Sequence, residues 1–269
     1  MAASSTVYLV SGSNRGIGLA LVTHLASRPN TIVFAGARNP NVASDLHALV
    51  AKHPNRVHVV ELKAGDVEGN KRAVEEIRKK AGQLDVVIAN AATCKDMQPL
   101  LGVSPELMRE HYDVNVIGTL VLFQAAYPLM KTSPTRKFIV IGAHGGAITT
   151  GPEYGVMLGP YAVTKAAVHY LAKKLQFENE DFVIFPILPG LVDTDMCKLA
   201  HYRTGSLRAA VLTKPSIDHY AQSNSEFLAK RPGVSAAECA SGIMRVVDGA
   251  TRENAGGKFL DAEGKVNEW

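Results

Sequence analysis

The sequence has 269 residues, of which 46% are hydrophobic and 20% are charged, an ordinary balance for a globular protein. This composition excludes a disordered chain, a coiled coil and a collagen-like rod, and the length is within reach of a single α/β domain. The formal net charge of +4 is small and the basic residues lie in short scattered groups, so we expect no nucleic-acid partner.

Short apolar segments alternate with amphipathic stretches along most of the chain. Strands are predicted at residues 6–11, 31–36, 56–61, 85–89, 137–142, 182–188 and 258–260. Helices are predicted to begin near Gly16, Val42, Glu68, Ser104, Tyr161 and Ser235. This alternation is typical of right-handed crossovers over a parallel sheet that is covered on both faces. The predicted fold class is α/β, with one Rossmann-type, doubly wound parallel sheet and no linker that would divide residues 1–269.

One long segment, residues 191–233, has no clear periodicity. Long irregular segments in compact domains are usually binding loops, and ligands of doubly wound sheets bind at the carboxyl ends of the strands. We therefore expect this segment to be a substrate lid. Its apolar and aromatic residues suit a bulky, mainly apolar substrate, although packing of the lid on the protein would require the same composition.

The three cysteines, Cys94, Cys197 and Cys239, lie far apart, without a Cys-x-x-Cys pair or a neighbouring His at ligand spacing. They are interpreted as free thiols in a reducing compartment, and no metal site is predicted. The amino terminus lacks the basic and apolar regions of a secretion signal, and no apolar run approaches the length of a membrane span. A cytoplasmic location without membrane attachment is therefore expected.

A glycine-rich turn, Ser11-Gly12-Ser13-Asn14-Arg15-Gly16-Ile17-Gly18, follows the first predicted strand. Glycines let the backbone approach a pyrophosphate, while the amino end of the next helix offers unpaired N–H groups and a positive dipole. A tight strand-to-helix connection is the simpler alternative. The position after an apolar strand at the start of the chain favours dinucleotide binding.

Tyr161 and Lys165 lie one helical turn apart, so their side chains share a helix face. A free phenol, with a pKa of about 10, is a poor acid near neutrality, and a nearby ammonium is expected to lower that pKa. Tyr161 could then protonate the oxygen of a ketone as hydride reaches its carbon. Taken alone, such a pair is often no more than two residues on one helix surface.

The choice between cofactors follows from charge. The second strand ends at Ala37-Arg38-Asn39 without an acidic residue, and Arg15 lies within the glycine turn. An acid at this strand end would bind a ribose 2′-hydroxyl, whereas arginines bind a 2′-phosphate. NADPH is therefore favoured over NADH, unless Arg38 is simply a solvated loop residue.

The spacing Gly-x-x-x-Gly-x-Gly resembles that of the short-chain dehydrogenase/reductase family, and further motifs match in order along almost the whole chain. They are Asp66-Val67, Asn90-Ala91-Ala92, Asn115 within Asp113–Val116, Tyr161-x-x-x-Lys165 and Pro189-Gly190-Leu191-Val192-Asp193-Thr194. The resemblance implies that Tyr161, Lys165 and Asn115 are catalytic, with Asn115 steadying Lys165 through water. It also implies an NADP(H) site made by Gly12, Arg15, Gly16, Ile17, Gly18, Arg38, Asp66, Val67, Asn90, Tyr161, Lys165, Pro189, Gly190, Val192 and Thr194.

Ala143 departs from the family pattern, because it stands where the family has a serine that binds the substrate oxygen. Loss of one such donor costs about 3 kcal/mol in the transition state of other enzymes. Another donor could replace it, the candidates being Thr149, Thr150, His144 and Tyr154. Alternatively, the ketone could carry its own internal hydrogen bond, as peri-hydroxylated aromatic ketones do, or the site could have lost hydride transfer.

Gly142-Ala143, the loop after them and residues 257–269 also resemble, more loosely, the norsolorinic acid ketoreductase-like branch of the family. This resemblance implies reduction of an aromatic, polyketide-like ketone in secondary metabolism. The leading hypothesis is an NADPH-dependent ketoreductase that acts on a small-molecule ketone. The alternatives are a non-redox cyclase, isomerase or dehydratase of the same fold, and an NADP-binding sensor. Residues 104–131 and the helix of Tyr161 resemble those that pair family members into homodimers or homotetramers.

Overall fold

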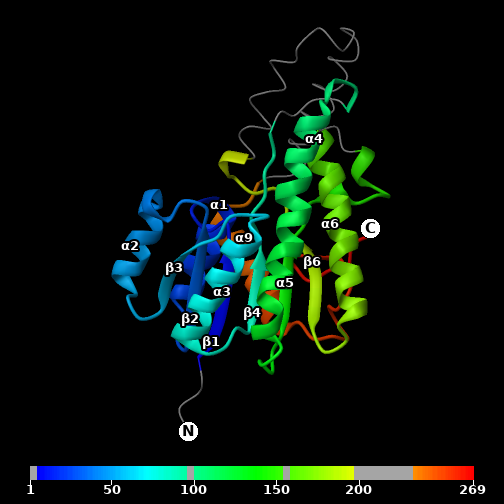
Figure 1. Ribbon diagram of the computed structural model, residues 1–269. Coiled ribbons are helices and arrows are strands. Elements are labelled where there is room, and N and C mark those ends of the chain that lie inside the picture. The colour runs from blue at the N-terminus through cyan, green and yellow to red at the C-terminus, as the bar shows by residue number, and fades with distance from the viewer. Residues whose placement is uncertain (1–4, 96–99, 154–157, 197–232) are drawn as a thin grey trace.

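A single seven-stranded sheet forms the centre of the protein (Figure 1). The computed structural model describes residues 5–95, 100–153, 158–196 and 233–269. The strands are β1 (Thr6–Ser11), β2 (Thr31–Ala37), β3 (Val57–Glu61), β4 (Val86–Ala89), β5 (Lys137–Ile141), β6 (Val183–Leu188) and β7 (Leu260–Asp261). Every neighbouring pair is parallel, in the order β3-β2-β1-β4-β5-β6-β7. The predicted fold class is confirmed.

Helices cover both faces of the sheet. They are α1 (Gly16–Ala26), α2 (Ser44–Lys52), α3 (Val67–Ala81), α4 (Pro105–Tyr112), α5 (Gly118–Met130), α6 (Gly159–Glu178) and α9 (Ala236–Gly249). Helices α1, α2 and α9 pack on one face, and α3, α5 and α6 pack on the other. Short helical turns lie at η1 (Pro40–Val42), η2 (Leu100–Gly102), η4 (His144–Gly146) and η5 (Gly151–Glu153).

Alternation along the strands builds a separate apolar core on each side of the sheet. In β1, Val7 and Leu9 enter the core beneath α3, α5 and α6, whereas Tyr8 and Val10 enter the core beneath α1, α2 and α9. Strands buried on both faces need near-continuous apolar sequence, which β1, β4 and β5 have. The two cores hold the carboxyl ends of the strands in fixed relative positions.

The strand order reverses between β1 and β4, which are neighbours in the sheet although β2 and β3 lie between them in sequence. Connections from these two strands diverge to opposite faces, so a crevice opens between their carboxyl ends. The glycine-rich turn follows β1 and Asn90 follows β4, so both lie at this reversal.

The observed boundaries lie within about two residues of the predicted ones, except that residues 104–131 are divided. A π-helical turn, η3 (Asp113–Ile117), joins α4 to α5. The continuous helical run Pro105–Met130 is long and apolar enough to cross a membrane by length and composition, so the statement that no run approaches that length is wrong. However, 56% of the most apolar 18-residue stretch of this run is buried in the protein, as expected of a core helix.

Candidate active site

The glycine-rich turn leaves no room for side chains at two positions. A Cβ on Gly12 would lie 2.8 Å from the Cα of Ala91, and the φ of Gly12 is +65°. A Cβ on Gly18 would lie 2.2 Å from the carbonyl oxygen of Gly12 and 2.6 Å from the Nδ2 of Asn90. The turn is therefore pressed against the segment that follows β4, and both positions require glycine.

Hydrogen bonds of Asn90 join the glycine-rich turn to the segment that follows β4. Its Nδ2 donates hydrogen bonds to the carbonyl oxygens of Ser11 at 2.9 Å and Gly12 at 3.1 Å. The backbone N–H groups of Asn90 and Ala91 both donate to the Ser11 hydroxyl at 3.0 Å. The predicted site residue Asn90 thus holds the glycine turn in place.

The amino end of α1 is open toward this turn. Arg15 occupies the N-cap position, and no side chain caps the helix there. Its Nη1 instead lies 3.3 Å from Asp195 Oδ2, with both side chains largely exposed. The uncapped N–H groups and the helix dipole form a ready site for an anion.

The segment after β6 passes over the same turn. Gly190 has a φ of +79°, and a Cβ on Gly16 would lie 3.4 Å from the Cγ2 of Thr194. The Cys239 thiol donates to the carbonyl oxygen of Pro189 at 3.4 Å, and Val192 pairs with Val234. The predicted segment Pro189–Thr194 is therefore brought beside the glycine turn, whereas most of the predicted lid, residues 197–232, lies outside the described residues.

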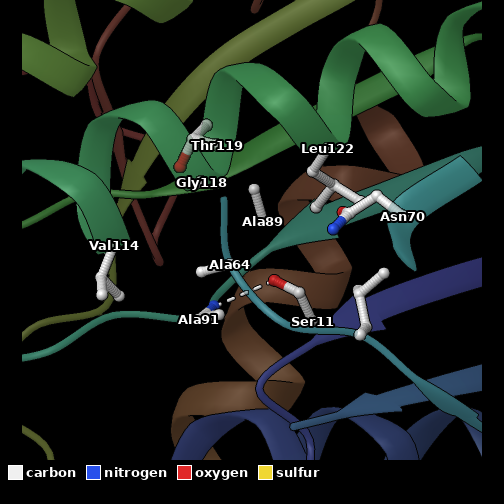
Figure 2. Close-up of a pocket in the computed structure, with 10 residues that line it drawn as sticks. Ser11, Ala64, Asn70, Ala89, Ala91, Val114, Gly118, Thr119 and Leu122 are labelled. Carbon is white, nitrogen blue, oxygen red and sulfur yellow. Dashed lines mark hydrogen bonds between the residues drawn. The ribbon is translucent and has the colours of Figure 1, made fainter. Parts of the chain in front are cut away.

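A pocket opens between the ends of β1, β3 and β4 and the start of α5 (Figure 2). Its lining includes Ser11 and Asn70, together with small apolar side chains at Ala64, Ala91 and Val114. Asp66, a predicted residue of the cofactor site, caps α3 by accepting a hydrogen bond from the N–H of Gly69 at 2.9 Å. Val67 is exposed beside it.

Ala64 and Val114, which line this pocket, were not predicted as site residues. A weak signal existed at Gly118, where a Cβ would lie 2.7 Å from the Cβ of Ala64. A glycine at the first position of α5 therefore marks a close approach of this helix to the segment after β3. The sequence does not show which segment the helix approaches at Gly118.

Tyr161 and Lys165 lie together near the start of α6, as predicted. The Nζ of Lys165 is 5.4 Å from the centroid of the Tyr161 ring, and it donates a 2.6 Å hydrogen bond to the carbonyl oxygen of Ile141 at the end of β5. The pair is thereby fixed to the carboxyl edge of the sheet. It lies two strands from the glycine turn, because β4 separates β5 from β1.

Burial governs the ionisation of this pair. It lowers the pKa of the Lys165 ammonium to about 8 and raises the pKa of the Tyr161 phenol above its usual value. The expected lowering of the Tyr161 pKa is therefore wrong, because the removal of the phenolate from water dominates. Tyr161 therefore holds its proton at neutral pH, and release of that proton to a carbonyl oxygen requires stabilisation of the phenolate that forms.

Asn115 lies in the π-helical turn and reaches the same helix. Its Nδ2 donates to the Thr164 hydroxyl at 2.9 Å, and that hydroxyl donates to the carbonyl oxygen of Tyr161 at 2.8 Å. Asn115 also exchanges two hydrogen bonds with the backbone of Thr93, at 2.8 and 3.0 Å. The side chain thus ties the segment after β4 to the first turn of α6, next to Lys165.

Cys94, predicted only to be a free thiol, is a further group at this site. It is buried close enough to interact electrostatically with Tyr161 and Lys165. Burial raises the pKa of the Cys94 thiol to about 12, against the opposing effect of Lys165. Cys94 is therefore a neutral thiol, and nothing in its sequence surroundings would have placed it there.

Ala143 follows β5 in extended conformation, and no hydroxyl stands at this position. Among the proposed substitutes, the Thr149 hydroxyl donates to the main-chain oxygen of Trp269, and the Thr150 hydroxyl lies 3.1 Å from His144 Nε2. Tyr154 lies outside the described residues. Thr149 is thus engaged away from the site, while His144 and Thr150 form a pair on the loop that starts at Ala143.

Arg38 is exposed just after β2. The N–H of Ser13 donates to the carbonyl oxygen of Gly36 at 2.9 Å, so the glycine turn is joined to the end of the same strand. Among the described residues, no group of three or more His, Cys, Asp or Glu side chains could hold a metal ion.

Comparison with known proteins assigns this arrangement to a family. The family model described as short chain dehydrogenase matches residues 6–203. The chain belongs to the short-chain dehydrogenase/reductase family. Family members are oxidoreductases that use a nicotinamide cofactor on small carbonyl compounds and alcohols, and the resemblance noted in the sequence is confirmed.

Several curated relatives cover nearly the whole chain. Norsolorinic acid ketoreductase of Dothistroma septosporum is 34% identical over 263 residues, covering 95% of this chain and 89% of that protein. The enzyme of the same name from Aspergillus parasiticus is 32% identical over 260 residues, with 95% and 88% covered. An uncharacterised oxidoreductase of Schizosaccharomyces pombe is 32% identical, with 98% and 97% covered. The looser resemblance to the norsolorinic acid ketoreductase branch is thus also confirmed.

Solved structures share the fold of this chain. The crystal structure of an NADPH-bound carbonyl reductase from chicken fatty liver has a TM-score of 0.80 and 27% identity, covering 99% of this chain and 100% of that one. Carbonyl reductase Sniffer of Drosophila melanogaster, at 19% identity, shares the fold with a TM-score of 0.79 and the same coverage.

Proposed function

We propose that this member of the family is an NADPH-dependent ketoreductase in which Tyr161 is the general acid. The observation that carries the proposal is the Lys165 ammonium held 5.4 Å from the Tyr161 ring by its bond to Ile141. A protonated phenol beside a fixed cation can release its proton at a carbonyl oxygen, because the cation stabilises the phenolate that remains.

Most residues of the candidate site would bind the cofactor, whereas Tyr161 would act on the substrate. Gly12, Gly16, Ile17 and Gly18 would hold the pyrophosphate at the amino end of α1, with Asp66, Val67 and Asn90 on the adenosine side. Pro189, Gly190, Val192 and Thr194 would cover the nicotinamide, and Lys165 would bind its ribose. When bound, the reduced nicotinamide supplies hydride to the carbonyl carbon. The Tyr161 phenol gives its proton to the carbonyl oxygen, and the product is an alcohol.

The cofactor preference is proposed from Arg15 within the glycine turn and Arg38 just after β2, because β2 has no acidic residue at its end. Arg38→Ala should raise KM for NADPH by roughly 10- to 100-fold, because hydrogen bonds between charged groups contribute about 1.5–3 kcal/mol. KM for NADH should change less than about twofold, since NADH lacks the 2′-phosphate. Initial rates with each cofactor test this, and an equal effect on both would contradict a 2′-phosphate site.

The proposed substrate is a bulky aromatic or polyketide-like ketone. The norsolorinic acid ketoreductases among the relatives support this class. Ala143 also supports it, because a ketone with its own internal hydrogen bond does not need a hydroxyl at that position. The direct test is to mix the protein with NADPH and a panel of ketones, with and without peri-hydroxyl groups, and to follow the loss of NADPH absorbance. Failure on every ketone would contradict the proposal.

Ala143 equally favours a second candidate, a non-redox enzyme that retains the dinucleotide as a structural group. That candidate requires conversion of a substrate with no net change in the ratio of NADPH to NADP.

Ala143→Ser tests what the missing hydroxyl means for a ketoreductase. In a ketoreductase the new hydroxyl should preserve or raise kcat, because it adds a donor toward the carbonyl oxygen. The measurement is kcat for the best ketone of the panel. A collapse of kcat would instead show that the site is shaped around the methyl group.

We further propose that the protein acts as a homodimer or homotetramer in the cytoplasm. The exposed side chains Val163, Tyr170 and Phe177 follow one another at seven-residue intervals along α6, so they form an apolar stripe on one face of that helix.

A further inference from the structure

The segment Phe259–Trp269 returns from the sheet to the loop that contains Ala143. After β7 it turns back, with Val266 paired to Leu260 and the N–H of Asn267 donating to the carbonyl oxygen of Phe259 at 2.7 Å. The main-chain oxygen of Trp269 then accepts two hydrogen bonds from Thr149, from its N–H and from its hydroxyl, both at 2.9 Å. The end of this segment therefore holds the far end of the Ala143–Thr149 loop.

The indole ring of Trp269 is held on α6. The Nζ of Lys173 lies 4.4 Å from its centroid, within the range of a cation–π interaction. The rings of Phe259 and His169 lie 5.9 and 6.4 Å from it. These contacts place Trp269 beside α6, where the carboxyl terminus is seen in Figure 1.

The near end of the loop depends on the same cluster of rings. His169 Nε2 accepts a hydrogen bond from the N–H of Ala143 at 3.3 Å, and the His169 ring packs 4.4 Å from that of Phe259. A Cβ on Gly142 would lie 2.6 Å from His169 Nε2. Trp269 thus holds the far end of the loop directly, and His169, whose ring contacts that of Trp269, holds the near end.

Between its two ends, the loop presses directly on the helix that carries the proposed acid. A Cβ on Gly146 would lie 2.6 Å from the backbone and Cβ of Lys165. A shift of the loop would therefore change the space beside Lys165 and, one helical turn away, Tyr161.

We propose that Trp269 is a positioning residue that locks the Ala143–Thr149 loop against α6 and so sets the shape of the ketone site. This inference rests on the proposed function. The loop starts at the position that lacks a hydroxyl, so the orientation of the substrate depends more on the loop's shape than on a single donor.

The test compares Trp269→Ala with Trp269→Phe and with Glu263→Ala, a control in the exposed turn of the same segment. Trp269→Ala should raise KM for the best ketone at least tenfold, change kcat less than threefold and leave Kd for NADPH unchanged. Trp269→Phe should restore KM to within threefold, because a ring returns to the cluster, and Glu263→Ala should behave as the wild type. An unchanged KM, or a matching loss of NADPH binding, would overturn the proposal.

A second readout does not depend on activity. Hydrogen–deuterium exchange at the Thr149 amide should accelerate at least tenfold in Trp269→Ala and stay unchanged in Glu263→Ala. Unchanged exchange in Trp269→Ala would overturn the proposal. If the wild type reduces no ketone, the proposed function fails, and exchange at Thr149 alone decides whether Trp269 locks the loop.

Discussion

Replacement of Tyr161 by phenylalanine should lower kcat for ketone reduction by roughly 10²- to 10⁴-fold, the usual contribution of a positioned general acid. The substitution removes only the hydroxyl, so the Lys165 ammonium and its bond to Ile141 remain. Kd for NADPH should therefore change little, since the pyrophosphate and adenosine sides of the site are distant from the phenol. Steady-state kinetics and a fluorescence titration with NADPH measure the two quantities separately.

Tyr170→Phe is the matched control, because Tyr170 lies on the same helix but is 70% exposed. It should retain wild-type kcat. Equal rates for Tyr161→Phe and the wild type would show that the proton comes from elsewhere, and the His144–Thr150 pair would be the first alternative to examine. Loss of NADPH binding in Tyr161→Phe would show that the hydroxyl serves cofactor binding instead of proton donation.

Acid should destabilise the protein by about 2 kcal/mol between pH 7.5 and pH 5 through His169 alone. Burial and the neighbouring Lys165 charge lower the pKa of His169 to about 3, whereas the unfolded chain titrates near 6.5. Below pH 6.5 the unfolded state therefore binds a proton that the folded state does not, so stability is lost as the pH falls. Nε2 accepts a hydrogen bond from the N–H of Ala143, which a proton on that nitrogen would break, and the opposing effect of a backbone hydrogen bond with Gly146 is outweighed by burial.

Urea unfolding at a series of pH values measures this effect. His169→Gln should flatten the pH dependence, because a glutamine oxygen can still accept from the N–H of Ala143 but does not titrate in this range. His58→Gln is the control: His58 is less buried, so that variant should retain most of the wild-type slope. A His169→Gln variant with the full wild-type slope would contradict a neutral buried His169.

The fold could be predicted from sequence because burial on both faces imposes long apolar runs on the strands, and these runs are visible. The end of β5 followed from such a run, whereas the importance of Ala143 followed from the resemblance to the family pattern. The division of residues 104–131 could not be predicted, because a π-helical turn keeps the same apolar periodicity within one or two residues. The strand predicted at residues 258–260 is present as β7 but begins two residues later, because only two of its residues pair with β6.

Some residues of the candidate site could likewise be predicted from the sequence, and others could not. Residues that the backbone geometry requires, such as Gly12 and Gly18, can be predicted from residue type and spacing. The cluster of His169, Phe259 and Trp269 does not, because its members are far apart in sequence and each is an ordinary core residue when taken alone. The pKa of Tyr161 was missed in direction, since spacing reports the nearby Lys165 cation but not the depth of burial that opposes it.

The contact between Gly18 and the Gly12 carbonyl has a practical consequence for redesign of cofactor preference. Even a methyl group at position 18 would have to occupy space that the Gly12 oxygen and Asn90 already fill. A mutant library aimed at NADH use should therefore keep the turn invariant and randomise the exposed residues after β2, where new carboxylates can be introduced without disturbing the packing of the turn.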